Sequence, residues 1–209
     1  MIKEFPKDQC KISICMGEYE RYLDQLDRRL YLTVPIEDGA FDFDMTVATE
    51  IVDNIIAYNR EDRDLPKEER KPIRLYINSP GGDVTDGFAI VNAIKISKTP
   101  IYTVNIGQWS SMAFLIGITG HRRFSLPNMT FLMHDGSTFT FGSANKAQDK
   151  MKFEQRYENE VVKSHIMAYS KMTSSEYDAL SRVEYYMLPE DAIKHGFIDE
   201  IVEDINTIL

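Results

Sequence analysis

The sequence predicts an α/β fold, because strand-like and helix-like segments alternate along the chain. The clearest unit consists of two strands, at residues 73–78 and 101–106, with an amphipathic helix between them. Both strands are rich in β-branched and aromatic residues, and each ends where glycine and serine begin. Ligands and catalytic groups of such sheets gather at the carboxyl ends of the strands. The loops at 79–82 and 107–112 are therefore the first candidates for a functional site.

The rest of the chain supports the same class. Pro35 closes an early strand, because proline cannot donate to a central ladder. Thr173 and Glu176 have the spacing of a capping box, and Gly196 suits the C-terminal end of the last helix. In chain order we expect a strand at 30–35, a helix at 45–58, a helix at 84–97, a helix starting near 111, a turn at 124–128, a strand at 129–133, a long helix at about 146–170 and short helices after 173 and at 189–194. The predicted buried faces include Val47, Ile51, Val52, Ile55, Ile56, Val84, Phe88, Val91 and Ile94.

Composition indicates a soluble globular protein. A length of 209 residues suits one domain or at most two small ones, and the hydrophobic fraction of 43% and charged fraction of 27% are ordinary. The net charge of −9 argues against a nucleic-acid-binding surface, which is usually basic.

The cysteines and the N-terminal residues indicate the cellular compartment of the protein. Cys10 and Cys15 match no zinc or redox motif, so a reducing compartment is the default and no metal site is expected. The first residues lack the apolar segment of a secretory signal, and the longest apolar run, at 112–118, is too short to cross a bilayer. We therefore expect a cytoplasmic protein that binds neither membrane nor nucleic acid.

Ser111 and His134 are candidates for a nucleophile and its base. A serine hydroxyl needs a base to take its proton, and a third group usually orients that base. Ser111 follows one strand and His134 ends another, so both side chains are expected at one edge of the sheet. Gly81 and Gly82 can bring a backbone N–H to that edge, as an oxyanion hole requires. The residues alone leave a simpler interpretation open, in which Ser111 caps a helix and His134 is a loop histidine.

Four segments in order resemble motifs of the ClpP family, the proteolytic subunits of the Clp protease. They are residues 76–87, with Asn78-Ser79-Pro80-Gly81-Gly82; 107–115, with Gly107-Gln108-Trp109-Ser110-Ser111-Met112; 123–128, followed by Met133-His134; and 186–199. The resemblance extends over about residues 28–202. It implies a ClpP/crotonase-like α/β fold of stacked ββα units, in a single domain spanning 1–209, with a protruding handle helix at about 146–170.

The resemblance also implies catalytic roles. Ser111 matches the nucleophile and His134 the general base of a serine endopeptidase that forms an acyl-enzyme. Gly82 and Met112 lie where backbone amides of the family form the oxyanion hole. The third triad member of the family is usually an aspartate, and the matching position here is Glu184. A glutamate can orient histidine, but Asp135 and Asp178 are alternatives, and Glu184 can also be a surface carboxylate.

Substrate binding and assembly are implied in the same way. Gly82 and Val84 match the edge on which a polypeptide substrate pairs as an added strand, and Ser137 falls near the opposite edge. The handle helix matches the one that interlocks two heptameric rings into a chamber, and the segment at 17–22, within residues 1–27, resembles the axial gate. No cofactor is implied, since ATP is used only by a partner AAA+ unfoldase.

Two departures from the family pattern are apparent. Trp109 replaces a small residue beside the nucleophile, where it either narrows the specificity pocket or fills the core. The surface that would receive the unfoldase is normally aromatic, but the matching positions are Arg74, Tyr76 and Ile96, and a guanidinium is a poor neighbour for an apolar peptide. These residues argue against docking of a standard Clp ATPase through the contacts that are usual in the family.

Two other function classes stay open. Glu184 and Trp109 fit a catalytically silent ClpP-like ring subunit with an assembly or regulatory role. An acyl-CoA enzyme of the related crotonase fold would use a similar oxyanion hole, but the Ser111-Met112 pair and His134 argue against it. The remaining histidines, at positions 121, 165 and 195, are weaker candidates for catalysis.

Overall fold

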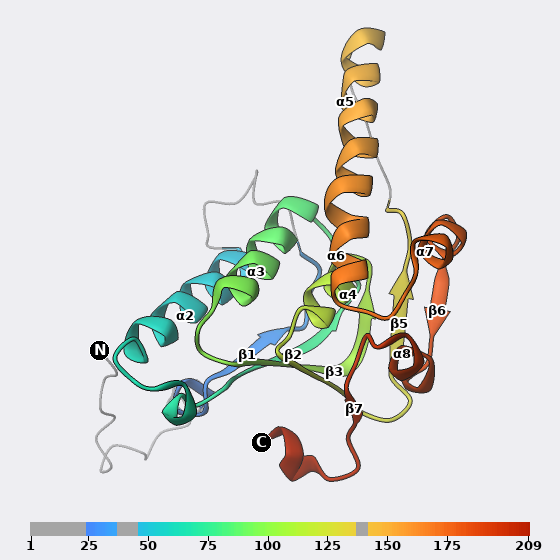
Figure 1. Ribbon diagram of the computed structural model, residues 1–209. Coiled ribbons are helices and arrows are strands. Elements are labelled where there is room, and N and C mark those ends of the chain that lie inside the picture. The colour runs from blue at the N-terminus through green and yellow to red at the C-terminus, as the bar shows by residue number, and fades with distance from the viewer. Residues whose placement is uncertain (1–23, 37–45, 137–141) are drawn as a thin grey trace, which may run out of the picture.

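The computed structural model describes residues 24–36, 46–136 and 142–209. Figure 1 shows a sheet with helices packed against it and one long helix that projects far beyond the body of the molecule. The segment at 17–22, both cysteines and Ser137 lie outside the described residues, so what was inferred for them stays a prediction.

The sheet of the described residues has seven strands, most of them parallel. Its order is β1-β2-β3-β4-β7, and β5 pairs with both β3 and β6. Only the pairing of β5 with β6 is antiparallel within this part of the chain. The strands are β1 (Arg29–Leu32), β2 (Ile73–Ser79), β3 (Ile101–Ser110), β4 (Arg122–Ser125), β5 (Thr130–Met133), β6 (Tyr185–Met187) and β7 (Glu200–Ile201).

Strand β3 is the longest described strand, and beside β2 on one edge it pairs with two strands on the other. Its first half pairs with β4, through Tyr102↔Arg122, and its second half pairs with β5, through Ser110↔Leu132. It therefore runs four residues further than the predicted 101–106 and ends directly before Ser111. The turn predicted at 124–128 is shorter than expected, because Phe124 and Ser125 belong to β4.

The helices agree closely with the predicted segments. Thr173 and Glu176 form the expected capping box, and Gly196 ends α8 in the left-handed conformation at φ 71°. The helices are α2 (Val47–Glu61), η3 (Lys67–Glu69), α3 (Val84–Ile96), α4 (Met112–Ile118), α5 (Ala144–Tyr157), η4 (Glu158–Val162), α6 (Lys163–Ala168), α7 (Ser174–Leu180), α8 (Pro189–His195) and η5 (Ile205–Ile208). The predicted long helix is thus the run of α5, η4 and α6, in which η4 is a π-helical turn.

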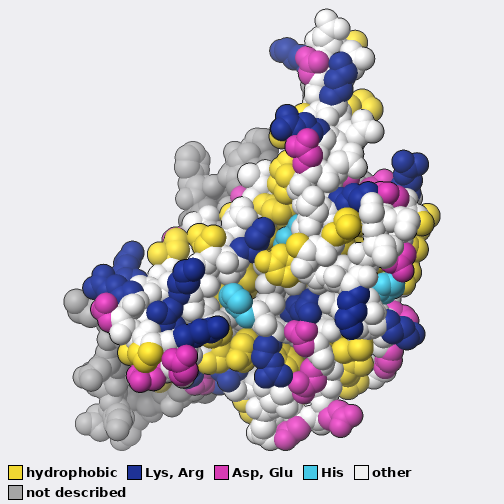
Figure 2. All heavy atoms as spheres, in the orientation of Figure 1, with side chains coloured by type: hydrophobic (Ala, Val, Ile, Leu, Met, Phe, Trp, Pro, Cys, Tyr) yellow, Lys and Arg dark blue, Asp and Glu magenta, His cyan; other side chains and the backbone are white. Residues whose placement is uncertain are grey.

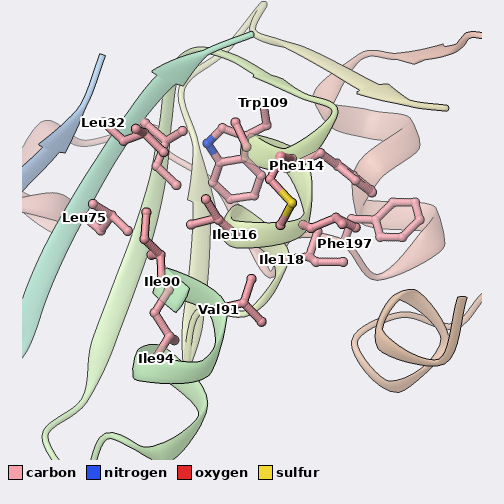
Figure 3. Packing of buried hydrophobic residues seen from close by; sticks show 14 of the residues in the cluster. Leu32, Leu75, Ile90, Val91, Ile94, Trp109, Phe114, Ile116, Ile118 and Phe197 are labelled. Carbon is pink, nitrogen blue, oxygen red and sulfur yellow. The ribbon is translucent and has the colours of Figure 1, made fainter. Parts of the chain in front are cut away.

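Buried apolar side chains form clusters on both faces of the sheet. Along β2, Leu75 and Ile77 join the large cluster and Tyr76 the small one, because successive side chains point to opposite faces. Figure 3 shows the large cluster, in which side chains from β3, α3 and α4 pack together. The small cluster consists of Tyr76, Val104, Phe124, Val202 and Ile208.

Two predicted core residues are exposed instead. Ile56 in α2 is 49% exposed, because α2 turns Ile51, Ile55 and Tyr58 inward. Val84 is 46% exposed, because it is the first residue of α3 and precedes the buried face of that helix.

Candidate active site

Ser111 lies at a sharp turn between β3 and α4. Its backbone has φ 54° and ψ −123°, a conformation that a residue with a side chain rarely adopts. Its N–H donates to the carbonyl of Leu132 in β5 at 2.9 Å, which fixes the turn against the neighbouring strand. Strained turns between a strand and a helix present the nucleophile in other hydrolases. Ser111 is half-buried, and its hydroxyl has no hydrogen bond to any described residue.

The loop after β2 approaches Ser111 closely because it contains two glycines. Gly81 and Gly82 have φ 90° and 146°, which suit only glycine. A Cβ on Gly81 would lie 2.7 Å from the nitrogen of Met112, and one on Gly82 would lie 2.0 Å from the carbonyl oxygen of Ile36. Ile36 holds the loop in return: its N–H donates to the Gly81 carbonyl at 2.9 Å and its carbonyl accepts from Asp83 at 2.8 Å. The main chain therefore brings the two loops of the predicted site into contact.

Two backbone N–H groups at this contact have no acceptor in the part of the chain that the structure describes. Met112 is the first residue of α4, so its N–H has no intrahelical partner. The N–H of Gly82 lies between two groups that bond to Ile36 and itself donates to no described residue. Free, preorganised N–H groups beside a nucleophile are what an oxyanion hole needs.

His134 comes to the same edge of the sheet. It follows β5, two residues beyond Leu132, which pairs with Ser110. The imidazole is half-exposed, and within the described residues it makes no hydrogen bond to the Ser111 hydroxyl. Catalytic hydrogen bonds are often long without substrate, so this spacing leaves His134 a candidate base.

Glu184 lies opposite His134 by register but is engaged elsewhere. The antiparallel pair Met133↔Tyr185 makes His134 and Glu184 the next two opposed residues. Glu184 is exposed, and its Oε2 accepts a hydrogen bond from the Tyr186 hydroxyl at 2.8 Å. This hydrogen bond to the carboxylate raises the pKa of Tyr186.

Asp135 and Asp178, the alternatives to Glu184 as the third triad member, differ in their surroundings. Asp178 accepts a hydrogen bond from Lys163 Nζ at 2.6 Å, so it is already paired. Asp135 is exposed and adjoins His134. Neither of them makes a hydrogen bond to His134 in the described part of the chain.

Glu158 is a half-buried carboxylate that the sequence analysis did not consider. It is half-buried in η4, and its Oε1 accepts a hydrogen bond from the hydroxyl of the buried Tyr177. Burial raises the pKa of Glu158, the Tyr177 hydrogen bond lowers it, and the charges of Asp135 and His134 raise and lower it in turn. Glu158 is therefore tied to α7 through Tyr177.

The predicted substrate edge is accessible at Val84. This side chain is exposed and follows Asp83, whose Oδ1 caps α3 by accepting from the Asp86 N–H at 2.8 Å. Gly82 lies two residues before it and follows Gly81, whose backbone packs against the Ser111 turn.

Trp109 fills the core and does not line a pocket. It is 0% exposed and packs edge-on against Phe131, with ring centroids 5.4 Å apart. Gly117 in α4 makes room for it, because a Cβ there would lie 2.4 Å from the indole. Of the two interpretations of Trp109, the core position is confirmed.

The other histidines take no part in the Ser111 turn within the described chain. His121 Nδ1 accepts from the Ile101 N–H at 2.9 Å, and His195 Nε2 lies 3.0 Å from the Tyr185 hydroxyl. His165 is buried and contacts the Thr119 hydroxyl and the Leu115 carbonyl in α4, at 3.0 and 3.2 Å. It therefore joins α6 to the helix that Ser111 begins.

A hollow of about 730 Å³ lies away from this edge, among the C-terminal ends of α3, α6 and α8. Arg123 crosses it and is fully engaged with the Asp199 carboxylate and the carbonyls of Tyr169 and Gly196, at 2.6 to 3.1 Å. The hollow contains none of the predicted catalytic residues, and a bonded arginine of this kind serves the fold.

Comparison with known proteins now identifies the family. The family described as Clp protease matches residues 28–205. The chain belongs to the Clp protease family. A curated relative, the ATP-dependent Clp protease proteolytic subunit of Streptococcus mutans serotype c, is 31% identical over 189 residues, which cover 89% of this chain and 89% of the relative. The predicted family and ClpP-like α/β fold are confirmed, and the chain is a ClpP-type peptidase.

The surface at the predicted unfoldase position is also visible in this Clp protease chain. Ile96 is 75% exposed, whereas Tyr76 is buried under Tyr31, which stacks on it with centroids 5.4 Å apart. The Tyr76 hydroxyl donates to the carbonyl of Ile208 in η5, and Ile208 is buried against it. Arg74 has a buried Nε without a partner among the described residues.

Two absences concern the described residues alone. No group of three or more His, Cys, Asp or Glu side chains there is arranged to hold a metal ion. None of the helices in these ranges has the length and apolar character to span a bilayer.

Proposed function

We propose that this Clp protease family member is a serine endopeptidase with Ser111 as its nucleophile. The observation that carries the proposal is the strained Ser111 turn, held against β5 and against the Gly81–Gly82 loop. A turn of this kind costs free energy that the core must offset, which is expected where chemistry requires it.

In the proposed reaction His134 takes the Ser111 proton as the hydroxyl attacks the scissile carbonyl. The N–H groups of Gly82 and Met112 stabilise the oxyanion. His134 then gives the proton to the leaving amine, which leaves an acyl-enzyme on Ser111. Water, activated by the same imidazole, releases the acyl group and restores the serine. Glu184 is proposed to orient the imidazole, which requires it to turn away from Tyr186.

The proposed substrate is an unfolded polypeptide that pairs as an added strand along Gly82 and Val84, with Ser137 at the other edge. Main-chain pairing tolerates many side chains. No cofactor takes part, and ATP would be used only by a partner unfoldase.

A homo-oligomer of two heptameric rings is part of the proposal. Its support is the projecting helix, on which Met151 and Phe153 are each 61% exposed. Figure 2 shows apolar and charged side chains interspersed along this helix. Exposed apolar residues on a projecting element indicate an interface with another copy.

A catalytically silent ring subunit is the second candidate. It is favoured by the Glu184–Tyr186 hydrogen bond and by the lack of a hydrogen bond between Ser111 and His134 among the described residues. The two candidates make opposite predictions for covalent labelling.

The test is labelling with a fluorophosphonate probe and hydrolysis of a fluorogenic peptide. We expect wild type to take the label, and Ser111→Ala to lose it together with roughly 10⁴-fold or more of the peptidase activity. Ser110→Ala is the matched control, because this neighbouring hydroxyl bonds to Gln108 Oε1 at 3.1 Å and should keep label and activity. Native mass spectrometry on the same samples measures ring formation. Assembled wild-type rings that take no label would establish the silent subunit instead.

A further inference from the structure

Ser79 is a buried serine at the end of β2 that the proposed reaction does not use. It is 0% exposed and pairs in register with Trp109 of β3, two residues before Ser111. Strands β2 and β3 lie side by side, so Ser79 lies at the edge of the sheet where the Ser111 turn begins (Figure 1). A hydroxyl is costly to bury unless it is hydrogen-bonded, so its partners indicate its role.

The Ser79 hydroxyl joins two parts of the main chain. It donates to the carbonyl of Val34 at 2.7 Å, and it accepts from the N–H of Gly81 at 3.2 Å. Pro80, between Ser79 and Gly81, has no N–H, so the Gly81 N–H is the first donor of the loop. Short side-chain hydrogen bonds of this kind fix the backbone of a turn. The loop after β2 is therefore tied to the segment that follows β1.

The same segment fixes the direction of the Gly82 N–H. Ile36 donates its N–H to the Gly81 carbonyl at 2.9 Å. In a planar trans peptide, a carbonyl and the N–H of the next residue point in opposite directions. The bond from Ile36 therefore turns the Gly82 N–H away from Ile36, where it meets no acceptor within the described residues. The peptide between Gly81 and Gly82 is thus held at its oxygen by Ile36, and the N–H that precedes it is held by Ser79.

Two consecutive glycines need such ties if they are to present a donor. Glycine has more conformational freedom than any other residue, and Gly81 and Gly82 have φ values of 90° and 146°. An oxyanion donor must be held within about 0.5 Å of its productive position. Ser79 supplies one of the ties through its side chain, so a substitution can remove that tie without changing either glycine.

We propose that Ser79 is a positioning residue, whose hydroxyl holds the Gly81–Gly82 peptide so that the Gly82 N–H can donate to the oxyanion. The proposal rests on the proposed serine peptidase function and adds a residue to the same site. In that reaction Ser111 Oγ bonds to the substrate carbonyl carbon, its proton passes to His134, and the carbonyl oxygen takes the negative charge. Ser79 touches none of these atoms and acts through the direction of one N–H. Its effect therefore belongs to the transition state and not to ground-state binding.

The test compares Ser79→Ala with Ser125→Ala in the assembled protein. Ser125 is the matched control, because it is also 0% exposed and its hydroxyl also donates to a main-chain carbonyl, that of Leu126, at 2.9 Å. It lies in β4, which pairs with the opposite half of β3. Steady-state hydrolysis of a fluorogenic peptide measures kcat and KM. Ser79→Ala is expected to lower kcat by roughly 10- to 10²-fold with little change in KM, and Ser125→Ala should keep both.

A pair of inhibitors separates positioning from a general effect on the fold. A peptidyl trifluoromethyl ketone forms a hemiketal with a serine nucleophile, and the former ketone oxygen then occupies the oxyanion hole. The corresponding peptidyl alcohol fills the same groove but has no carbonyl to attack, so it forms no oxyanion. Ser79→Ala should weaken binding of the ketone by about the same factor as it lowers kcat/KM, and leave binding of the alcohol unchanged. A purely structural role would weaken both equally.

The outcomes separate this inference from the proposed function. If wild type hydrolyses the peptide and Ser79→Ala is as active as Ser125→Ala, or binds ketone and alcohol equally less tightly than wild type, the role of Ser79 is overturned and the serine peptidase stands. A wild type that takes no fluorophosphonate label and hydrolyses no peptide overturns the proposed function and the positioning role together. If Ser79→Ala does not assemble, Ser79→Cys decides by the same measurements, because a thiol is close in size but only a weak donor and acceptor.

Discussion

The two halves of the candidate site are built differently. The nucleophile half, with Gly81, Gly82, Ser111 and Met112, is fixed by the main chain and by steric limits at the glycines. The base half depends on side chains from several elements, and the described residues show no hydrogen bond from His134 to any carboxylate. The proposed role of the first half needs no rearrangement of these groups, whereas the proposed role of Glu184 needs its side chain to turn away from Tyr186.

The difference suggests how activity is controlled. Backbone N–H groups and a strained turn are preorganised and lose little entropy when substrate binds. A base with no hydrogen bond to a carboxylate in the described chain depends on a side-chain movement to gain its partner. We infer that substitutions in the nucleophile half abolish most of the peptidase activity, and that substitutions in the base half reduce it by smaller factors.

Gly82→Ala should give the largest effect of the predictions that test this comparison. The added Cβ would lie 2.0 Å from the Ile36 carbonyl oxygen, at a φ of 146°, so the loop must move and take the Gly82 N–H with it. Losing one oxyanion donor costs about 10²- to 10³-fold in kcat. Steady-state peptide hydrolysis measures this loss.

Gly136→Ala is the matched control in the base half. Gly136 also has a positive φ, of 71°, but a Cβ there meets nothing within 4 Å among the described residues. It should therefore cost much less activity than Gly82→Ala. Equal losses in the two variants would contradict the distinction between the halves.

His165 packs against α4, the helix that follows Ser111, and makes the stability of the protein depend on pH. Burial lowers the pKa of His165 from 6.5 to about 4, and the Leu115 hydrogen bond offsets this only in part. Between pH 6.5 and about 4, His165 is protonated in the unfolded chain but stays neutral in the folded chain. The free energy of unfolding therefore has its full value above pH 6.5 and decreases as the pH falls toward 4. The loss amounts to about 3 kcal/mol in the free energy of unfolding.

Denaturant unfolding at pH 7 and at pH 4.5 checks this expectation. His165→Leu is the comparison, because it removes the titrating group and puts an apolar side chain in the buried space between α6 and α4. The variant should lose less stability than wild type over this interval. The same pH dependence in both proteins would show that His165 does not titrate as expected.

Gly117→Ala should have the smallest effect and act on stability. The new Cβ would lie 2.4 Å from the Trp109 ring, and overpacking of this kind costs about 1–3 kcal/mol. Thermal unfolding should report a Tm lower by several degrees, at roughly 2–4 °C per kcal/mol for a chain of this size. In a Trp109→Leu background the clash disappears, so Gly117→Ala should cost less there. Purely additive effects in this double-mutant cycle would rule out the pairing.

The nucleophile half was largely predictable from sequence, because it follows from strand ends. A strand that stops at glycines and another that stops at a serine must bring those residues to one edge of a parallel sheet. His134 could be placed by the same rule. Val84 was predicted wrongly as a core residue, since its position at the start of α3 depends on the cap at Asp83, and its place on the substrate edge stays a prediction.

The contacts of the long helix and the last two strands of the sheet could not be predicted in the same way. Glu158 lies on a charged helix, where a carboxylate is usually solvated, and the π-helical turn leaves no mark in the periodicity. Its bond to Tyr177 joins residues 19 positions apart on different helices. Strands β6 and β7 have three and two residues, too few to form a recognisable pattern.

The contact between η5 and Tyr76 has a consequence for recognition. A peptide that packed on Tyr76 in the position of Ile208 would have to displace a residue of the same molecule. A tethered competitor acts at an effective concentration on the order of millimolar. A ligand for this face would therefore compete with the η5 segment of the same chain. Removing that segment would increase the apparent affinity of the ligand, although the ligand would make no new contact.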